Sequence, residues 1–198
     1  MGDQFREVVI QRLMGICNLS PAQIELLESH YELLLRWSRV LNLTSIRTLA
    51  EAAERHYCES IFAALQLPRR VSIIDIGSGG GFPGIPMAIM LEDCRVTLVE
   101  SHARKAVFLK EAARGLPNAV VVAGRVEELE GHFDWAVSRA VQFGEIATSI
   151  EKLAENVEVL SGDVRPDDRA CFEWRKPIHM PWSERRFIWI AHVSSREI

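Results

Sequence analysis

Residues 71–84 read V-S-I-I-D-I-G-S-G-G-G-F-P-G. The stretch begins with a short apolar run rich in β-branched residues, which lies between Arg70 and five consecutive glycine or serine positions. Such a run is typical of a strand buried on both faces of a parallel sheet. An apolar segment follows at 85–91, and prolines stand only at the positions of its first turn, where a helix tolerates them. The stretch therefore predicts a strand, a glycine loop and a helix.

Three glycines of this loop, Gly77, Gly79 and Gly81, stand at alternate positions. Glycine permits a positive φ and lets the backbone approach a ligand that a side chain would push away. A loop for a dinucleotide pyrophosphate needs a small residue where Phe82 stands, and Asp75 would repel a pyrophosphate but attract a sulfonium or an α-ammonium group. The pattern D-x-G-x-G-x-G is similar to the loop of class I S-adenosylmethionine (SAM) methyltransferases. An ordinary turn between a strand and a helix is the alternative.

Length and composition bound the class of protein. The 198 residues fit one domain with an accessory segment, and 48% hydrophobic with 25% charged residues is typical of a soluble globular chain. The longest apolar run, 85–91, is too short to cross a bilayer, and the charged N-terminus lacks a cleavable signal. We therefore expect a cytoplasmic enzyme without a membrane partner. The net charge of -4 opposes a protein that coats nucleic acid, although a local basic face stays open.

The four cysteines are widely scattered, at positions 17, 58, 94 and 171. They form no C-x-x-C pair, and no histidine stands at the spacing of a metal ligand. We expect reduced core residues, with neither a metal site nor a disulfide framework.

The first third of the chain has the periodicity of helices. Apolar residues recur with helical spacing over 5–16. Ser20, followed by Pro21 and Gln23, predicts the start of a second helix, and Thr48 with Glu51 predicts a third that runs through 65. Residues 1–67 are thus an expected helical lead-in, and residues 68–198 an expected Rossmann-like domain.

Three further strands are expected, at 95–99, 118–123 and 133–138, with a helix over 103–114. In open α/β sheets, ligands bind beyond the carboxyl ends of the parallel strands. Asp75, Glu100, Val126-Glu127 and Arg139 should therefore face one crevice. Glu100 stands near the offset at which an acid binds ribose hydroxyls, which favours a cofactor that contains adenosine. A solvated acid that caps the next helix is the alternative.

Several motifs identify the chain as similar to one family, the bacterial small-subunit ribosomal RNA guanine-7-methyltransferases, also called glucose-inhibited division protein B. The motifs are, in order, W-x-x-x-x-N-L-T-x-I-R (37–47), R-H (55–56), D-I-G-S-G-G-G-F-P-G-I-P (75–86), T-L-V-E-S (97–101), K-A-V-F-L (105–109), G-R-V-E-E (124–128), S-R-A (138–140) and E-R-R-F-I-W-I (184–190). The match spans roughly residues 35 to 192.

The resemblance implies a class I SAM-dependent methyltransferase fold: α/β, Rossmann-like, with a mostly parallel seven-stranded sheet after an N-terminal helical segment. It also implies that SAM is the cofactor, held by Gly77, Phe82, Val126, Glu127 and Arg139. The product would be 7-methylguanosine in 16S ribosomal RNA. The expected partner is that RNA or the small ribosomal subunit, and we expect the chain to act as a monomer.

One position departs from the family pattern. A lysine-glycine pair usually follows the fifth strand, whereas Ser161-Gly162 stands here after the apolar residues 157–160. If the family lysine contacts RNA or the target base, another cation such as Arg165 must replace it, or the activity is weaker. The missing lysine also keeps open a SAM-binding regulatory or assembly protein.

The expected reaction needs no strong general base among the side chains. Nitrogen 7 of guanine presents an unprotonated lone pair at neutral pH, so positioning and desolvation suffice. The fourth strand ends in S-R-A, without the Asn/Asp-Pro-Pro-aromatic tetrad of amino-group methylation, and the chain has no Pro-Cys nucleophile. Arg139 is therefore the candidate catalytic residue, in a positioning role toward the guanine carbonyl edge, the cofactor or a phosphate. An ion pair with Asp75 or Glu127 is the alternative.

RNA binding would need a local basic patch. Candidate cations at the end of the lead-in are Arg36, Arg39, Arg47 and Arg55, and those in the last third are Arg165, Arg169, Arg175, Lys176, Arg185 and Arg186. Solvated faces are the alternative for both groups. Trp37 and His56 are expected to pack the lead-in onto the sheet. Methylation of another RNA site or a small molecule remains the second enzymatic hypothesis, and a nicotinamide-dependent oxidoreductase is the third.

Overall fold

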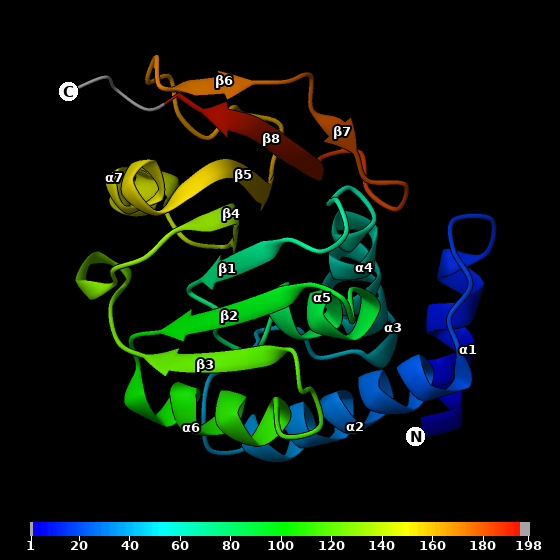
Figure 1. The fold of residues 1–198 in the computed structure, drawn as a ribbon. Coiled ribbons are helices and arrows are strands. Elements are labelled where there is room, and N and C mark those ends of the chain that lie inside the picture. The colour runs from blue at the N-terminus through cyan, green and yellow to red at the C-terminus, as the bar shows by residue number, and fades with distance from the viewer. Residues whose placement is uncertain (1, 195–198) are drawn as a thin grey trace.

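The computed structural model describes residues 2–194, which form an α/β fold around one sheet (Figure 1). The strands are β1 (Ser72–Ile76), β2 (Arg95–Glu100), β3 (Ala119–Ala123), β4 (Phe133–Arg139), β5 (Ala154–Ser161), β6 (Phe172–Trp174), β7 (Ile178–His179) and β8 (Phe187–Val193). Their order is β3-β2-β1-β4-β5-β8-β6, and β7 also pairs with β8. The strands β1 to β5 are parallel, and β8 is antiparallel to β5.

The sheet has eight strands where the resemblance predicted seven. The difference arises because β5 occupies one edge of β8, while β6 and β7 both pair along its other edge. Trp174 pairs with Ala191 and Ile178 with Ile188, so the two short strands share one position in the sheet. The mostly parallel α/β fold is confirmed.

The helices are α1 (Gly2–Leu13), α2 (Pro21–Trp37), α3 (Leu49–Ala52), α4 (Glu59–Ala64), α5 (Gly84–Met90), α6 (Ala103–Ala112) and α7 (Phe143–Leu153). The capping box predicted for the second helix is present, because Ser20 Oγ accepts from the Gln23 backbone and Gln23 Oε1 accepts from the Ser20 backbone. The third predicted helix is continuous, but its middle, Ala53–Cys58, is π-helical and joins α3 to α4. Single π-helical turns are frequent at functional sites.

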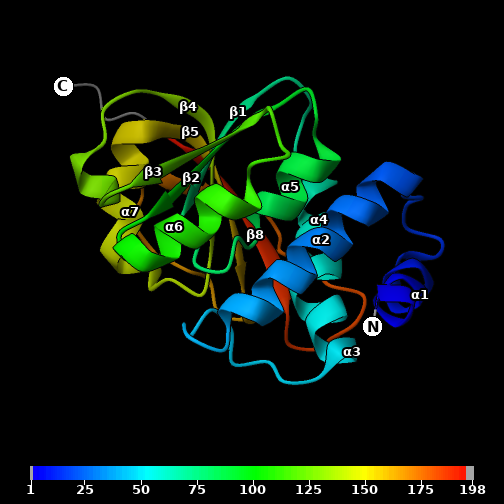
Figure 2. The same cartoon turned by 90° about the horizontal axis from the view of Figure 1, so that it is seen from below.

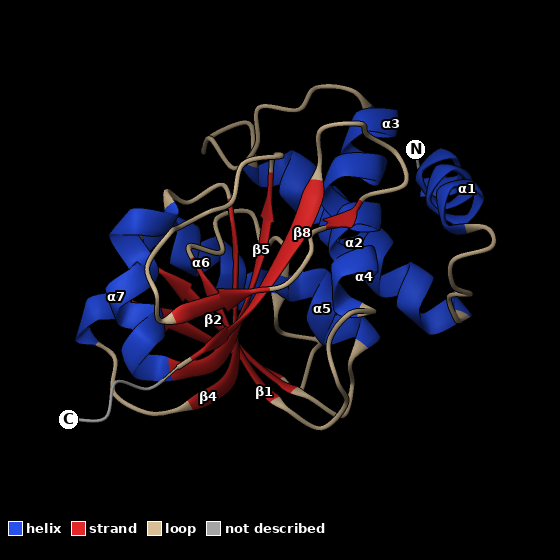
Figure 3. Cartoon of the chain, turned by 90° about the horizontal axis from the view of Figure 1, so that it is seen from above, coloured by secondary structure: helices blue, strands red, loops and turns tan. Residues whose placement is uncertain are grey.

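Two apolar clusters lie on opposite faces of the sheet. One contains buried residues of α1, α2, α4, α5 and α6, and the other contains residues of α7. Figures 2 and 3 show α7 on one side of the strands, with α2, α4 and α5 on the other. Phe5 and Tyr57 of the lead-in share their cluster with Ile73 of β1 and Phe82 of the loop. The first helices therefore pack on the sheet, and the border at residue 67 stays a prediction.

None of the helices in residues 2–194 is long and apolar enough to pass through a lipid bilayer. Three of the cysteines, Cys58, Cys94 and Cys171, are buried, and Cys17 is half-buried.

One buried acid in the sheet is not accounted for by the fold. Glu158 of β5 is 0% exposed and pairs in register with Val137 and Ile190, and neither of its carboxyl oxygens has a hydrogen-bond partner in residues 2–194. Burial raises the pKa of Glu158 well above its ordinary value. A buried polar group without a partner costs stability.

We predict that Glu158→Leu raises the free energy of unfolding at pH 7 by about 1–3 kcal/mol, because it removes this desolvation cost. The raised pKa means that the wild-type carboxyl destabilises the fold as pH rises above the value of the unfolded chain. The advantage of the variant should therefore grow between pH 4.5 and pH 7. Urea unfolding at several pH values measures it. Glu155→Leu, at an exposed position of the same strand, should show no such gain; an equal gain in both variants would refute the explanation.

Candidate functional site

A cavity of about 360 Å³ opens at the carboxyl edge of the central strands. In the register of the sheet, Ile76 at the end of β1 lies beside Ser138 of β4, so the glycine loop and the residues after β4 meet there. The lining residues come from the segment before α3, the π-helical turn, the loop, α6, the end of β4 and the turn before β8: Leu43, Thr44, Ser45, Ile46, Arg55, His56, Gly77, Ser78, Gly79, Gly80, Phe82, Lys105, Arg139, Ala140 and Arg186.

The end of β2 holds the glycine loop in place. The backbone N–H groups of Gly77 and Ser78 donate to the Val99 carbonyl, and the Gly79 N–H donates to Glu100 Oε2 at 2.9 Å. Gly77 and Gly79 have φ values of 75° and 54°, in the region that favours glycine. An added Cβ at Gly79 would make only an ordinary van der Waals contact, 3.7 Å from the Gly77 carbonyl oxygen, so this position has room for a side chain.

Asp75 lies beneath the loop and is fully buried. Its Oδ2 accepts a hydrogen bond from the backbone of Gly84 in the first turn of α5, at 3.0 Å, and its Oδ1 has no partner in the described part of the chain. Burial raises the pKa of Asp75 to about 7, against the lowering effect of the hydrogen bond from the Gly84 backbone, while the Ser78 hydroxyl donates to the Asp75 backbone carbonyl. Asp75 does not line the cavity in this structure, so its predicted attraction for a sulfonium stays a prediction.

The other predicted residues are divided between the cavity and its surroundings. Gly77, Gly79, Phe82 and Arg139 line the cavity. The residues outside its lining are Gly81, Glu100, Val126 and Glu127.

Packing explains the conformation at Gly81. Its φ is 86°, and an added Cβ would lie 2.7 Å from Ile85 and 3.1 Å from Nε2 of His30. Nothing larger than glycine fits between these side chains.

Glu100 binds backbone N–H groups on two sides. In addition to its bond from Gly79, it accepts at Oε1 from the backbone of His102, at 2.7 Å, just before α6. The contact with His102 is of the kind that the capping alternative predicts. Val126 is buried and Glu127 is exposed in the 3₁₀ turn Val126–Glu128, so their predicted contact with SAM is untested.

Arg139, the last residue of β4, has a buried Nη1 without a hydrogen-bond partner in residues 2–194. The alternative of an ion pair with Asp75 or Glu127 is not observed among those residues. Burial lowers the pKa of Arg139 to about 10, and charge repulsion from Arg186 acts in the same direction. Ala140 follows with φ of 58°, an uncommon conformation for a residue with a Cβ.

His56 and Thr44 also line the cavity, a position that the sequence patterns did not predict. The His56 ring stacks on Phe82 with centroids 4.5 Å apart, and its Nε2 lies 2.6 Å from Thr44 Oγ1. Burial first, and then the charges of Arg139 and Arg55, lower the pKa of His56 to about 3, so the ring is neutral at physiological pH. The predicted packing of His56 on the sheet domain is confirmed by this stack. Trp37 also joins the lead-in to the sheet domain, because its Nε1 donates a hydrogen bond to Glu111 of α6.

Four cationic side chains reach the cavity, Arg55, Lys105, Arg139 and Arg186, and none of its described lining residues carries a carboxylate. Arg186 donates to the buried Glu59 at 2.8 Å, and Arg55 donates to the half-exposed Glu51 at 2.9 Å. Both acids stand outside the lining. The cavity is therefore electropositive and suits an anionic ligand.

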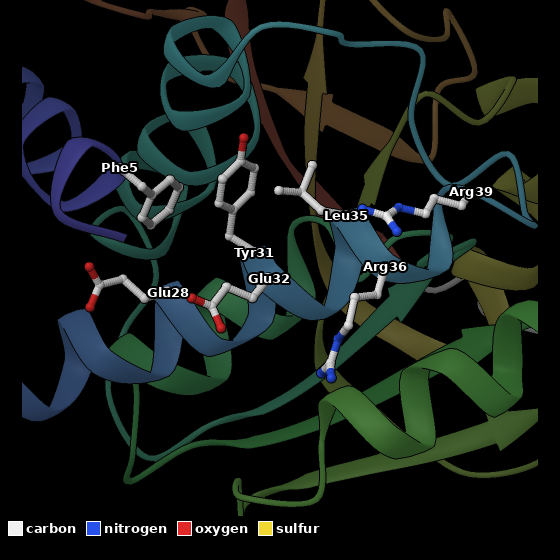
Figure 4. A pocket seen from close by; sticks show the side chains of 7 residues that line it. All are labelled: Phe5, Glu28, Tyr31, Glu32, Leu35, Arg36 and Arg39. Atoms are coloured by element: carbon white, nitrogen blue, oxygen red, sulfur yellow. The ribbon is translucent and has the colours of Figure 1, made fainter. Parts of the chain in front are cut away.

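A second cavity, of about 280 Å³, lies between α1 and α2 (Figure 4). It is lined by Phe5, Glu28, Tyr31, Glu32, Leu35, Arg36 and Arg39. The rings of Phe5 and Tyr31 are stacked 4.6 Å apart, and Glu28 pairs with Arg6. No residue of the glycine loop or of the ends of the strands contributes to it, so it is separate from the electropositive cavity.

The strand order of this chain and its glycine loop after β1 are those of the class I SAM-dependent methyltransferase fold. The structure of a protein titled a putative O-methyltransferase from Klebsiella pneumoniae matches with a TM-score of 0.63 and 15% identity, covering 98% of this chain and 100% of that one. The structure titled a putative RNA methyltransferase from Pyrococcus horikoshii has a TM-score of 0.56 at 13% identity and covers 83% and 98%. Identities this low establish the fold alone.

The sequence defines the family within this class. The profile of the family described as rRNA small subunit methyltransferase G, or GidB, matches residues 23–161. The chain is 38% identical over 137 residues to the protein of this name from Chromobacterium violaceum, covering 67% of this chain. It belongs to the rRNA small subunit methyltransferase G family. The match spans 65% of the Chromobacterium violaceum relative, which is less than two thirds of that protein. Family and fold together imply S-adenosylmethionine as the cofactor.

Two glycine substitutions compare the cost of a steric clash with the cost of backbone strain. We predict that Gly84→Ala lowers the free energy of unfolding by about 3 kcal/mol, because its Cβ would lie 2.1 Å from Leu98 and 2.5 Å from Asp75 Oδ2. Gly79→Ala should cost only about 1–2 kcal/mol, the strain of a left-handed alanine. Urea denaturation of both variants checks the order. A smaller loss for Gly84→Ala than for Gly79→Ala would contradict the geometry of the loop.

Proposed function

We propose that this chain is a SAM-dependent methyltransferase that methylates nitrogen 7 of a guanine in 16S ribosomal RNA. The observation that carries this proposal is the electropositive cavity beside the methyltransferase loop, because a polyanionic substrate and a loop-bound methyl donor both find a place there. The names of the relatives support RNA of the small ribosomal subunit as the substrate.

The residues at the loop fit the cofactor. Gly79 lines the cavity, Nη1 of Arg139 is a donor without a partner, and Oδ1 of Asp75 is an acceptor without a partner in residues 2–194. We propose that Gly77, Gly79 and Phe82 hold SAM and that Arg139 stands between the cofactor and the nucleotide, where it binds the carboxylate, the guanine or a phosphate. Asp75 and Gly81 would act by shaping the loop.

We place the adenosine end of the cofactor toward Glu100, Val126 and Glu127. Glu100 ends β2, and Val126 and Glu127 follow β3; the carboxyl ends of these strands lie at the same edge as the end of β1. Each Glu100 oxygen accepts one backbone N–H, from Gly79 or His102, so the second lone pair of each would serve ribose hydroxyls.

When bound, SAM supplies an electrophilic methyl group. Nitrogen 7 would take this methyl group with its own lone pair while the C–S electron pair stays on sulfur, so no residue of the chain would need to move a proton. This fits a cavity that has no carboxylate in its described lining and a neutral His56. The chain's contribution would be to align the two reactants and exclude water.

We also propose that 1–67 is an accessory helical segment of the methyltransferase domain 68–198, since the two share one apolar cluster. The proposed substrate places the reaction in the cytoplasm. We propose a monomer, because one chain supplies all the residues named for the site.

We predict that the purified protein transfers methyl groups from SAM to small subunits isolated from a strain that lacks this mark. Chemical cleavage at 7-methylguanosine would locate the product. Transfer to another atom, or no transfer although S-adenosylhomocysteine binds, would contradict the proposed activity.

Gly79→Asn tests the cofactor site. Asparagine tolerates a left-handed backbone, and its side chain would occupy part of the cavity that Gly79 lines. We expect S-adenosylhomocysteine to bind about tenfold more weakly or worse, with a small change in melting temperature. Calorimetric titration measures the affinity, and wild-type affinity in the folded variant would rule out this site.

A further inference from the structure

We propose that Arg186, positioned by Glu59, forms with Arg139 a phosphate-binding site that holds the target nucleotide of the RNA. The inference rests on the proposed function for the identity of the substrate, and it assigns the acceptor side of the same cavity.

Arg186 is brought to the cavity by the sheet. It immediately precedes β8, and its neighbour Phe187 pairs in register with Ser161 at the end of β5. Its Nη2 donates to Oε2 of Glu59 at 2.8 Å, across 127 positions in the chain. The Glu59 side chain is only 2% exposed and that of Arg186 22%, so the ion pair is shielded from solvent and fixes the guanidinium.

Each of the two arginines has a buried hydrogen-bond donor without a partner in residues 2–194. These donors are Nε of Arg186 and Nη1 of Arg139. Both side chains line the cavity, and Arg139 is repelled by the charge of Arg186 but attracted more strongly by that of Glu59. Glu59 compensates one of the two charges. An anion with several acceptor oxygens, held between them, would satisfy the free donors and compensate the second charge.

The charge of the cavity favours a phosphate over the carboxylate of the cofactor as this anion. SAM carries a sulfonium, an ammonium and one carboxylate, so it is a net cation and brings no net negative charge to Arg139, whose Nη1 has no partner in residues 2–194. A nucleotide phosphate is a full anion, and the planar guanidinium binds its oxygens in pairs.

The topology of the sheet also places Arg186 on the acceptor side of the cavity. The glycine loop follows β1, while Arg186 precedes β8, and the order β1-β4-β5-β8 separates these two strands by β4 and β5. Arg139 ends β4, between them. Arg186 therefore stands on the side of Arg139 away from the loop, where an acceptor would lie once the loop holds the donor.

This placement also bears on the missing family lysine. Ser161 ends β5 and pairs in register with Phe187, the residue that follows Arg186. Arg165, which the sequence suggested as the replacement, instead pairs with Asp168 in an exposed segment and does not line the cavity. Arg186 thus supplies a cation beside the position that lacks one.

Guanosine 5′-monophosphate and guanosine are probes that differ only in the phosphate. With S-adenosylhomocysteine present, we expect the wild-type protein to bind the monophosphate about tenfold more tightly than the nucleoside. Arg186→Gln should abolish this preference and leave the affinity for S-adenosylhomocysteine within about twofold. Arg185→Gln, at the exposed neighbouring residue, is the matched control and should retain the preference.

Arg186→Gln leaves the buried Glu59 without its partner, so it could unfold the chain. The double variant Arg186→Gln/Glu59→Gln removes both charges and should fold, again without a preference for the phosphate. Loss of S-adenosylhomocysteine binding in either variant would show that the anion is the cofactor's carboxylate and overturn the proposal. So would an equal preference in the Arg186→Gln and wild-type proteins, or no preference in the wild type. Failure of RNA methylation with the phosphate preference intact would refute only the proposed activity.

Discussion

The hydrogen bond from the Gly84 backbone to the buried carboxyl of Asp75 is the contact on which the site depends. It joins the end of β1 to the first turn of α5, so the seven residues from Gly77 to Pro83 must fold back as a tight loop. Close packing at Gly81 and Gly84 leaves no room for another path. The fold thus uses its acid beneath the loop for structure, and leaves the cationic side chains to determine the charge of the cavity.

The helical lead-in, residues 1–67, contributes lining residues to the electropositive cavity at the edge of the sheet. Its π-helical turn presents Arg55 and His56 to the cavity, and the first turn of α4 places Glu59 behind Arg186. The stack of His56 on Phe82 joins this segment to the glycine loop. The lead-in therefore lines part of the electropositive cavity and also packs on the sheet through a shared apolar cluster.

Local patterns in the sequence predicted most of the fold and the place of several lining residues of the cavity, while their contact with a cofactor stays a prediction. The strand and loop at 71–84, the cap at Ser20 and the place of Arg139 at the end of β4 all follow from short-range signals. The pairing of Arg186 with Glu59 could not be predicted, because it joins residues 127 positions apart and depends on β8 running antiparallel beside β5. The pairing of both β6 and β7 with one edge of β8 could not be predicted for the same reason.

A crystal structure of the protein with S-adenosylhomocysteine and guanosine 5′-monophosphate tests the central claim most directly, namely that one electropositive cavity holds the donor on the loop and the acceptor phosphate beyond it. The account predicts the homocysteine ligand over Gly77, Gly79 and Phe82, and the phosphate in contact with both Arg139 and Arg186. A cofactor in the cavity between α1 and α2, or a phosphate that contacts neither arginine, would contradict it.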